Sequence, residues 1–177
     1  MYSIFVLFGL WFIECVLIFC KKKDPNMKII KPLIALLVLG LTSVSVHADT
    51  LSIALKERLS FIENAWNQGQ ADKLVKEIYL PQTQIAGEGS DDLYEGVSVS
   101  NLVSELVKDN KMVELQLIDV QALANDAALS WVQWHVTPTN GSTPAFDMKS
   151  LFVWKRSHGQ WRIVADMYTS GNLQKNN

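Results

Sequence analysis

The chain has 177 residues, a formal net charge of −2 and a hydrophobic content of 49%. This length favours a single domain. From residue 49 onward, Lys and Arg are scattered and acidic residues outnumber basic ones, so nucleic acid is not an expected partner.

The N-terminal leader differs in composition from the rest of the chain. Residues 1–20 are almost wholly apolar, which is long enough to cross a bilayer, and three lysines follow them. Two interpretations of residues 1–26 stay open: an upstream extension ahead of a start at Met27, or a membrane helix with its basic flank in the cytoplasm. In both cases the remaining chain is expected outside the cytoplasm, with membrane contact only through an uncleaved leader.

Residues 27–48 have the three parts of a secretory signal peptide. Two lysines precede the apolar run Leu33–Val46, and Val46-His47-Ala48 places small side chains at −3 and −1, the positions that a signal peptidase recognises. We therefore predict cleavage before Asp49, a periplasmic or secreted location, and one mature domain of residues 49–177.

The cysteines exclude several site chemistries from the mature domain. Cys15 and Cys20 both lie in the leader, so the domain has no disulfide and no thiolate ligand. Its two histidines, His135 and His158, are far apart in the sequence. We expect no zinc site and no cofactor.

Helical periodicity dominates the first half of the domain. A first helix is predicted from Asp49 or Thr50 to just before Gly69, a second over Ala71–Tyr79, and a third over Val97–Asp109. A short strand, Gln82–Glu88, and a polar loop separate the last two. The stripe that defines the first helix has spacings of four, four, three and four: Leu51, Leu55, Leu59, Ile62 and Trp66.

Strand patterns fill the second half. The predicted strands are Met112–Ala122, Ala127–Thr137, Ala145–Arg156 and Gln160–Thr169, separated by turn signals. This order predicts an α+β fold in which three N-terminal helices pack on a curved, mainly antiparallel sheet. Helices that cover one face of a curved sheet enclose a cone, and we expect a pocket at its open end.

Three segments resemble the nuclear transport factor 2-like superfamily. Residues Phe61–Asp72 look like its first helix and glycine-containing turn, Tyr94-Glu95-Gly96 like the junction before its third helix, and Phe152–Val164 like its final hairpin. The similarity spans Leu51–Gly171, and the nearest branch looks like the SnoaL-like and ketosteroid-isomerase-like bacterial domains. The resemblance implies a cone-shaped fold, homodimers formed through the sheet, and pockets for small, mostly apolar molecules.

The resemblance also implies catalytic positions that this sequence does not fill. The tyrosine of the ketosteroid isomerases falls on or near Ile62, and their late-strand acid falls near Ser150 or Leu151. Their base falls near Gly87, with Glu88 adjacent. We therefore expect that chemistry to be absent.

Three residues remain as acid–base candidates. Glu88 lies in the polar loop, where a solvated carboxylate is the plainer interpretation, and His135 is a lone strand histidine. Strict alternation in the last strand groups Asp166 with Arg162 and Tyr168, opposite a more apolar face. That grouping predicts Asp166 on the outer surface of the sheet.

Aromatic side chains are the strongest remaining signal. Trp131 and Trp134 point to opposite faces of one strand, so one of them is expected to meet solvent or a second subunit. The others can form a core or a site for a flat apolar ligand. The predicted pocket residues are Trp66, Tyr79, Tyr94, Trp134, Phe152, Trp154, Trp161 and Met167.

We interpret the domain as an exported one that binds a small apolar molecule or a partner without standard catalysis, and as a homodimer. Two alternatives stay open. One is a SnoaL- or isomerase-type enzyme that acts on a small apolar substrate through Glu88, Asp166 or His135. The other is a dimeric accessory protein whose sheet binds another protein.

Overall fold

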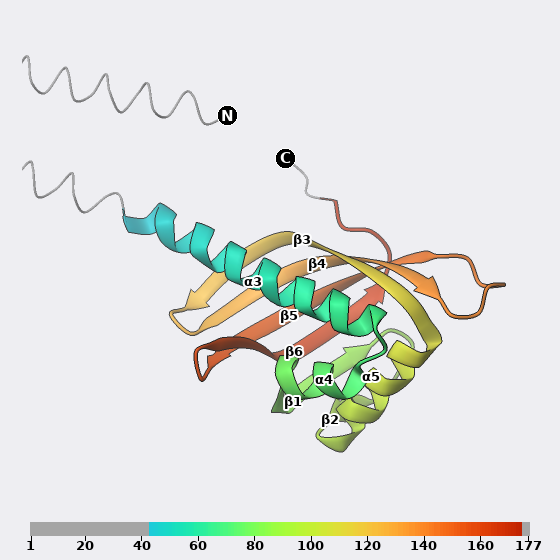
Figure 1. Ribbon diagram of the computed structural model, residues 1–177. Coiled ribbons are helices and arrows are strands. Elements are labelled where there is room, and N and C mark those ends of the chain that lie inside the picture. The colour runs from blue at the N-terminus through green and yellow to red at the C-terminus, as the bar shows by residue number, and fades with distance from the viewer. Residues whose placement is uncertain (1–42, 175–177) are drawn as a thin grey trace, which may run out of the picture. The chain divides into compact units, whose positions relative to one another are not determined.

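The computed structural model describes residues 43–174 (Figure 1). The two interpretations of residues 1–26, and the predicted signal peptide up to residue 42, lie outside the described residues. Within residues 43–174, no helix combines the length and the hydropathy needed to cross a membrane.

The described residues form three helices and six strands. The third predicted helix has the bounds that the sequence indicated, and the four long strands agree to within two residues. The short strand β2 was not predicted. The elements in chain order are α3 (Ser43–Asn67), α4 (Ala71–Ile78), β1 (Tyr79–Gly87), β2 (Leu93–Glu95), α5 (Val97–Asp109), β3 (Asn110–Ala124), β4 (Ala127–Pro138), β5 (Phe146–Ser157) and β6 (Gln160–Ser170).

The first helix begins earlier than the sequence pattern indicated. It starts at Ser43 rather than at Asp49 or Thr50, and the cleavage predicted before Asp49 therefore falls inside α3. Cleavage there would leave the apolar stripe of the helix intact. The export signal stays a prediction.

The strands form one mixed sheet with open edges, in the order β2-β1-β6-β5-β4-β3. Only the β1–β6 pairing is parallel, and the other four pairings are antiparallel. In Figure 1, α3 runs across one face of the curved sheet, and α4 and α5 lie near β1 and β2. The α+β class predicted from the sequence is confirmed.

The helices and the inner face of the sheet bury a common core. On α5 the buried residues have spacings of three, one and four, one face of a helix: Val99, Leu102, Val103 and Val107. A row of edge-to-face rings crosses the core, with centroid separations of 5.5, 6.1 and 5.4 Å. Its members are Trp66, Trp134, Phe152 and Trp154.

Side chains of α3 bind the free edge of β3. The amide of Val113 donates to Asn67 Oδ1 at 2.8 Å, and Asn67 Nδ2 donates back to the Val113 carbonyl at 3.0 Å. The amide of Leu115 donates to Glu63 Oε2 at 2.9 Å. Because β3 is an edge strand, its outward backbone groups lack a strand partner, and these side chains supply one.

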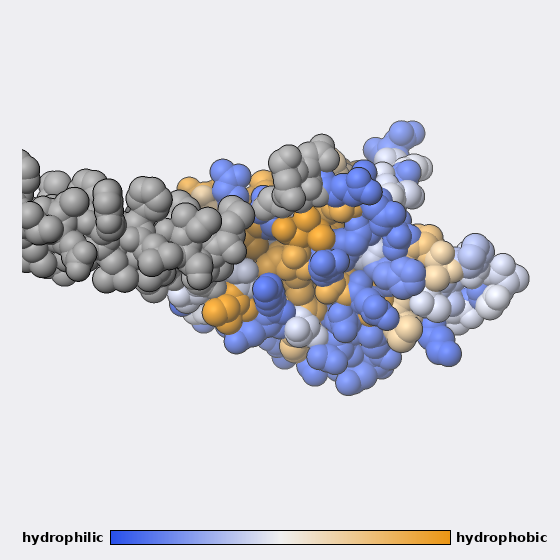
Figure 2. All heavy atoms as spheres, turned by 90° about the horizontal axis from the view of Figure 1, so that it is seen from above, coloured by the Kyte–Doolittle hydropathy of each residue, from blue (hydrophilic) through white to orange (hydrophobic). Residues whose placement is uncertain are grey.

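Beyond Leu115, α3 and β3 enclose a groove of about 370 Å³. Figure 2 looks down on the top of Figure 1, where β3 lies, and shows hydrophobic residues exposed between hydrophilic ones near its centre. The residues that line the groove are Lys56, Leu59, Ser60, Leu115, Gln116 and Leu117.

A β-bulge in β6 overturns one sequence prediction. Val153 pairs with Ala165 but Trp154 pairs with Ile163, so Val164 is an extra residue on its strand. The bulge reverses the alternation beyond it. Asp166 therefore faces the core and is only 8% exposed, and its predicted outward position is wrong.

We predict that the Asn67 contacts contribute strongly to stability. Asn67→Ala leaves the N–H and C=O of the buried Val113 without partners, which we expect to lower the free energy of unfolding by about 2 kcal/mol. Urea denaturation measures this change. Asn64→Ala is the matched control, since the Asn64 amide binds only the Ser60 carbonyl of its own helix. Equal losses in the two variants would contradict the prediction.

Candidate functional site

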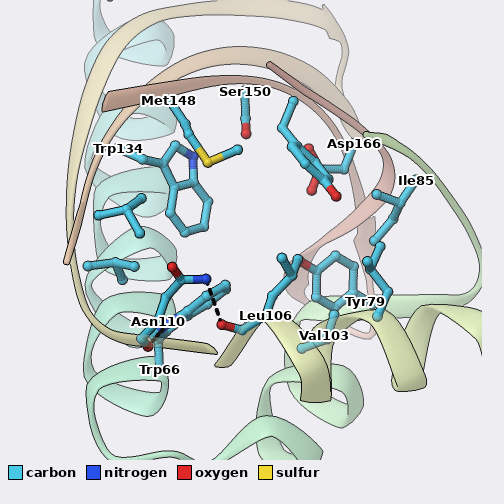
Figure 3. Close-up of a pocket in the computed structure, with 14 residues that line it drawn as sticks. Trp66, Tyr79, Ile85, Val103, Leu106, Asn110, Trp134, Met148, Ser150 and Asp166 are labelled. Carbon is cyan, nitrogen blue, oxygen red and sulfur yellow. Dashed lines mark hydrogen bonds between the residues drawn. The ribbon is translucent and has the colours of Figure 1, made fainter. Parts of the chain in front are cut away.

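A cavity lies between the helices and the inner face of the sheet (Figure 3). Its volume is about 50 Å³. Two helices, α3 and α5, and five strands, β1, β3, β4, β5 and β6, contribute to it, so its shape depends on most of the fold. It is lined by Trp66, Tyr79, Ile85, Leu102, Val103, Leu106, Asn110, Val113, Trp134, Val136, Met148, Ser150, Asp166 and Tyr168.

The polar groups of the cavity come mainly from the sheet. Figure 3 shows Ser150 of β5 and Asp166 of β6 on one side, with their oxygen atoms pointing inward. Val103 and Leu106 of α5 and Trp66 of α3 lie on the opposite side. A ligand in this cavity therefore meets the oxygen atoms of Ser150 and Asp166 within a mostly apolar lining.

Asp166 is the one carboxyl group that lines the cavity. Its Oδ1 is buried and has no hydrogen-bond partner among the described residues. Burial raises the pKa of Asp166 from 3.8 to about 8, because an ionised carboxylate loses its hydration there. None of the lining residues is Lys, Arg or His. At neutral pH the carboxyl group is therefore mostly protonated.

Burial also raises the pKa values of two tyrosines near Asp166. Burial raises the pKa of Tyr79 well above its ordinary value, and the nearby Asp166 and Tyr168 add to the shift. Burial, Asp166 and Tyr94 raise the pKa of Tyr168 in the same way. Both phenols thus stay neutral and are available as hydrogen-bond donors near Asp166.

Trp134 carries the second unpaired polar atom of the cavity. Its Nε1 is buried and has no hydrogen-bond partner among the described residues. In contrast, Trp66 Nε1 donates to the Asn110 carbonyl at 3.1 Å, and Asn110 Nδ2 donates to the Leu106 carbonyl at 2.9 Å. The unsatisfied hydrogen-bonding capacity therefore lies with Asp166 and Trp134, and a bound molecule can use it.

The half-buried members of the lining mark where the cavity approaches solvent. They are Leu106, Asn110, Met148 and Tyr168. Tyr168 pairs with Gly87 across the β1–β6 ladder, and a Cβ at Gly87 would lie 2.3 Å from the Tyr168 hydroxyl. The missing side chain at position 87 thus makes room for this phenol at the mouth.

The structure brings three of the eight predicted pocket residues into this lining: Trp66, Tyr79 and Trp134. Phe152 and Trp154 are fully buried in the core beside it. Tyr94 binds Ser90 through its hydroxyl at 3.2 Å and lies outside the lining, as does the half-buried Trp161. Met167 is 60% exposed, because the bulge in β6 turns it to the outer face.

The sequence did not show that Ser150 and Asp166 line the cavity together. Ser150 was named only as a position where the resemblance places an acid, and it does line the cavity. Met148, Asn110 and the α5 residues carried no chemical signal of their own. The α5 residues that line the cavity lie on the buried face of that helix.

The other two acid–base candidates lie outside the cavity. Glu88 is exposed and accepts hydrogen bonds from the backbone and hydroxyl of Ser170, which lower its pKa. His135 lies on the outer face and contacts Asp147 at 2.8 Å. Within the part of the chain that the structure describes, no group of His, Cys, Asp and Glu side chains is placed to hold a metal ion.

Comparison with known proteins identifies the fold. No family model and no curated protein matches the sequence. Solved structures do match. An NTF-2-like protein of unknown function from Shewanella oneidensis is 15% identical, with a TM-score of 0.55 over 66% of this chain and 97% of that one. A ketosteroid isomerase-like protein from Erwinia carotovora atroseptica is 14% identical, with a TM-score of 0.56 over 75% of this chain and 100% of that one.

A third structure is an uncharacterised protein with a cystatin-like fold from Caulobacter vibrioides. It is 16% identical, with a TM-score of 0.57 over 68% of this chain and 89% of that one. These matches confirm the nuclear transport factor 2-like fold that the sequence resemblance indicated.

We predict that Asp166 makes stability fall as the pH rises. Its pKa is about 8 in the folded chain against an ordinary value of 3.8, so between these values folding retains a proton that the unfolded chain has released. The free energy of unfolding should then decrease by up to about 1.4 kcal/mol per pH unit over this window and level off above it.

Urea unfolding at several pH values measures this slope. Asp166→Asn removes the titrating group, and we expect the variant to lack the corresponding part of the slope. Equal slopes in the wild type and the variant would contradict the assignment.

Proposed function

We propose that the domain is an exported, cone-shaped member of the nuclear transport factor 2-like superfamily that binds a small, mainly apolar molecule in this cavity. The observation that carries the proposal is a largely apolar lining in which Asp166 and Trp134 each keep an unpaired polar atom. Export to the periplasm or the medium rests on the signal-like residues 27–48.

The size of the cavity limits the ligand. Typical ligand pockets have volumes of about 300–1,000 Å³, and this one has about 50 Å³. It therefore fits a small molecule, or a small group of a larger one that extends through the mouth. Met148 lies at the mouth, and its unbranched thioether can change rotamer to admit more.

The second candidate function is an enzyme that transfers a proton. Asp166 favours it, because a carboxyl group with a pKa of about 8 in a mostly apolar cavity can give or take a proton near neutral pH. Loss of turnover in Asp166→Asn with ligand binding retained would support this candidate.

We also propose that a second copy of the chain covers the outer face of the sheet. Cross-strand pairing aligns an apolar row over five strands, in which Trp131 is 38% exposed, Met167 60% and Leu93 56%. An exposed apolar row of this extent favours association. The row, in order across the sheet, is Trp131, Leu151, Met167, Ala86 and Leu93.

We predict that blocking the mouth of the cavity weakens binding. Leu106→Trp places an indole at the mouth, and we expect at least about tenfold weaker binding of any ligand found in a panel of small apolar molecules, about 1.4 kcal/mol. Ligand-dependent changes in tryptophan fluorescence report the affinity.

Leu123→Trp is the matched control, because Leu123 is 52% exposed near the end of β3 and does not line the cavity. Unchanged binding in Leu106→Trp, or no wild-type response to the whole panel, would count against the proposal.

For the outer face, we predict a dimer in the wild type and a monomer in Met167→Lys. The substitution places a charge in the middle of the apolar row, where burial would cost it its hydration. Light scattering at micromolar concentration distinguishes the two states. Ile53→Lys on α3 is the control, since Ile53 is equally exposed, at 59%, but lies on a helix. A monomeric wild type would refute the prediction.

A further inference from the structure

We propose that the polar group of the ligand is an ammonium: the cavity binds a small organic amine whose cationic head lies against Asp166 among aromatic side chains. This inference rests on the proposed ligand-binding function and specifies the class of ligand. It follows from the aromatic lining, the unpaired carboxyl oxygen and the absence of any basic residue in that lining.

Aromatic side chains provide the first argument. Four of them line the cavity, Trp66, Tyr79, Trp134 and Tyr168, and they come from α3, β1, β4 and β6. Figure 3 shows the three that it labels placed around the open space. Aromatic rings attract cations through their quadrupoles, and aromatic enclosures of this kind hold alkylated ammonium groups.

The lone carboxyl group provides the second argument. Tyr79 of β1 and Tyr168 of β6 are the titratable groups that face Asp166, with Tyr94 of β2 next to Tyr168. The lining residues of α3, α5, β3, β4 and β5 carry no charged side chain. An ionised Asp166 thus lacks a countercharge from the protein, and an ammonium supplies one together with a donor for the unpaired Oδ1.

The net charge of the domain agrees with this ligand class. Acidic residues outnumber basic ones from residue 49 onward, so the domain attracts cations to its surface and repels anions. A carboxylate or phosphate ligand would in addition face Asp166 directly, with no Lys, Arg or His in the lining to receive it. An anionic ligand is therefore disfavoured.

A neutral oxygen ligand is the competing class, and proton linkage separates it from an amine. An amine that pairs with the carboxylate must displace the proton that Asp166 carries below about pH 8. Its affinity should then rise by up to about tenfold per pH unit below that value, with release of one proton per amine bound. A neutral alcohol or ketone gains nothing from this ionisation.

The experiment compares n-butylamine with n-butanol, which share a carbon chain and differ in charge. Tryptophan fluorescence gives both affinities at about pH 6 and about pH 7.5, where the alkylammonium stays charged and Asp166 changes ionisation. Calorimetry in two buffers of different ionisation enthalpy counts the protons released. We expect the amine to bind at least about tenfold more tightly at the higher pH, with the alcohol unaffected.

Three variants complete the design. Asp166→Asn should abolish amine binding, and its urea unfolding transition shows that the variant is folded. Tyr168→Phe keeps the carboxyl group and should retain proton release. Asp147→Asn removes a carboxylate on the outer face and controls for the general field of the domain.

Each outcome decides between the proposals. Binding of n-butanol without binding of the amine overturns the ammonium proposal and leaves the ligand pocket standing. Amine binding that is independent of pH, or that survives in Asp166→Asn, also overturns it. If neither compound binds, and the apolar panel gives no response, the proposed function itself fails.

Discussion

The irregular pairing of β6 with its two neighbours determines which of its side chains reach the cavity. On one side, Val164 is the extra residue of a bulge opposite β5. On the other, the β1 register shifts between Tyr79 and Gln84, and the Thr83 hydroxyl donates to the Ile163 carbonyl at 2.7 Å. The buried Thr83 hydroxyl thus supplies a partner for a β6 carbonyl at the place where the β1–β6 pairing is irregular.

The bulge explains why the elements were predictable and the site was not. Periodicity predicted α5 with its observed bounds, and alternation placed Trp131 and Trp134 on opposite faces, where the structure has them. The same alternation failed for Asp166 because one extra residue inverts every position after it. No glycine or proline marks the bulge. Pro81 lies in β1 between Tyr79 and Gln84, where the pairing with β6 is irregular, but the sequence alone does not show that these two strands pair.

The rigid and the adaptable parts of the cavity are distinct. The C-terminal half of α3 is tied to β3 through Glu63 and Asn67, and Trp66 lies between them with its own hydrogen bond to Asn110. These contacts fix the position of the Trp66 ring. At the mouth, Met148 and Leu106 are half-buried and carry side chains with several rotatable bonds. Adjustment to a ligand is therefore expected at the mouth rather than along α3.

Asp166 is a core residue whose burial does not stabilise the fold. A buried carboxyl group without a hydrogen-bond partner at Oδ1 costs stability, and either a neutral side chain of the same shape or an outward position would avoid that cost. Ser130 is another buried polar residue, but it has a partner. Its hydroxyl accepts a hydrogen bond from the Trp154 indole at 2.8 Å. Asp166 has no such arrangement and lies against the cavity instead. A buried carboxyl group that lacks a hydrogen-bond partner and lines a cavity is better explained by ligand binding than by packing.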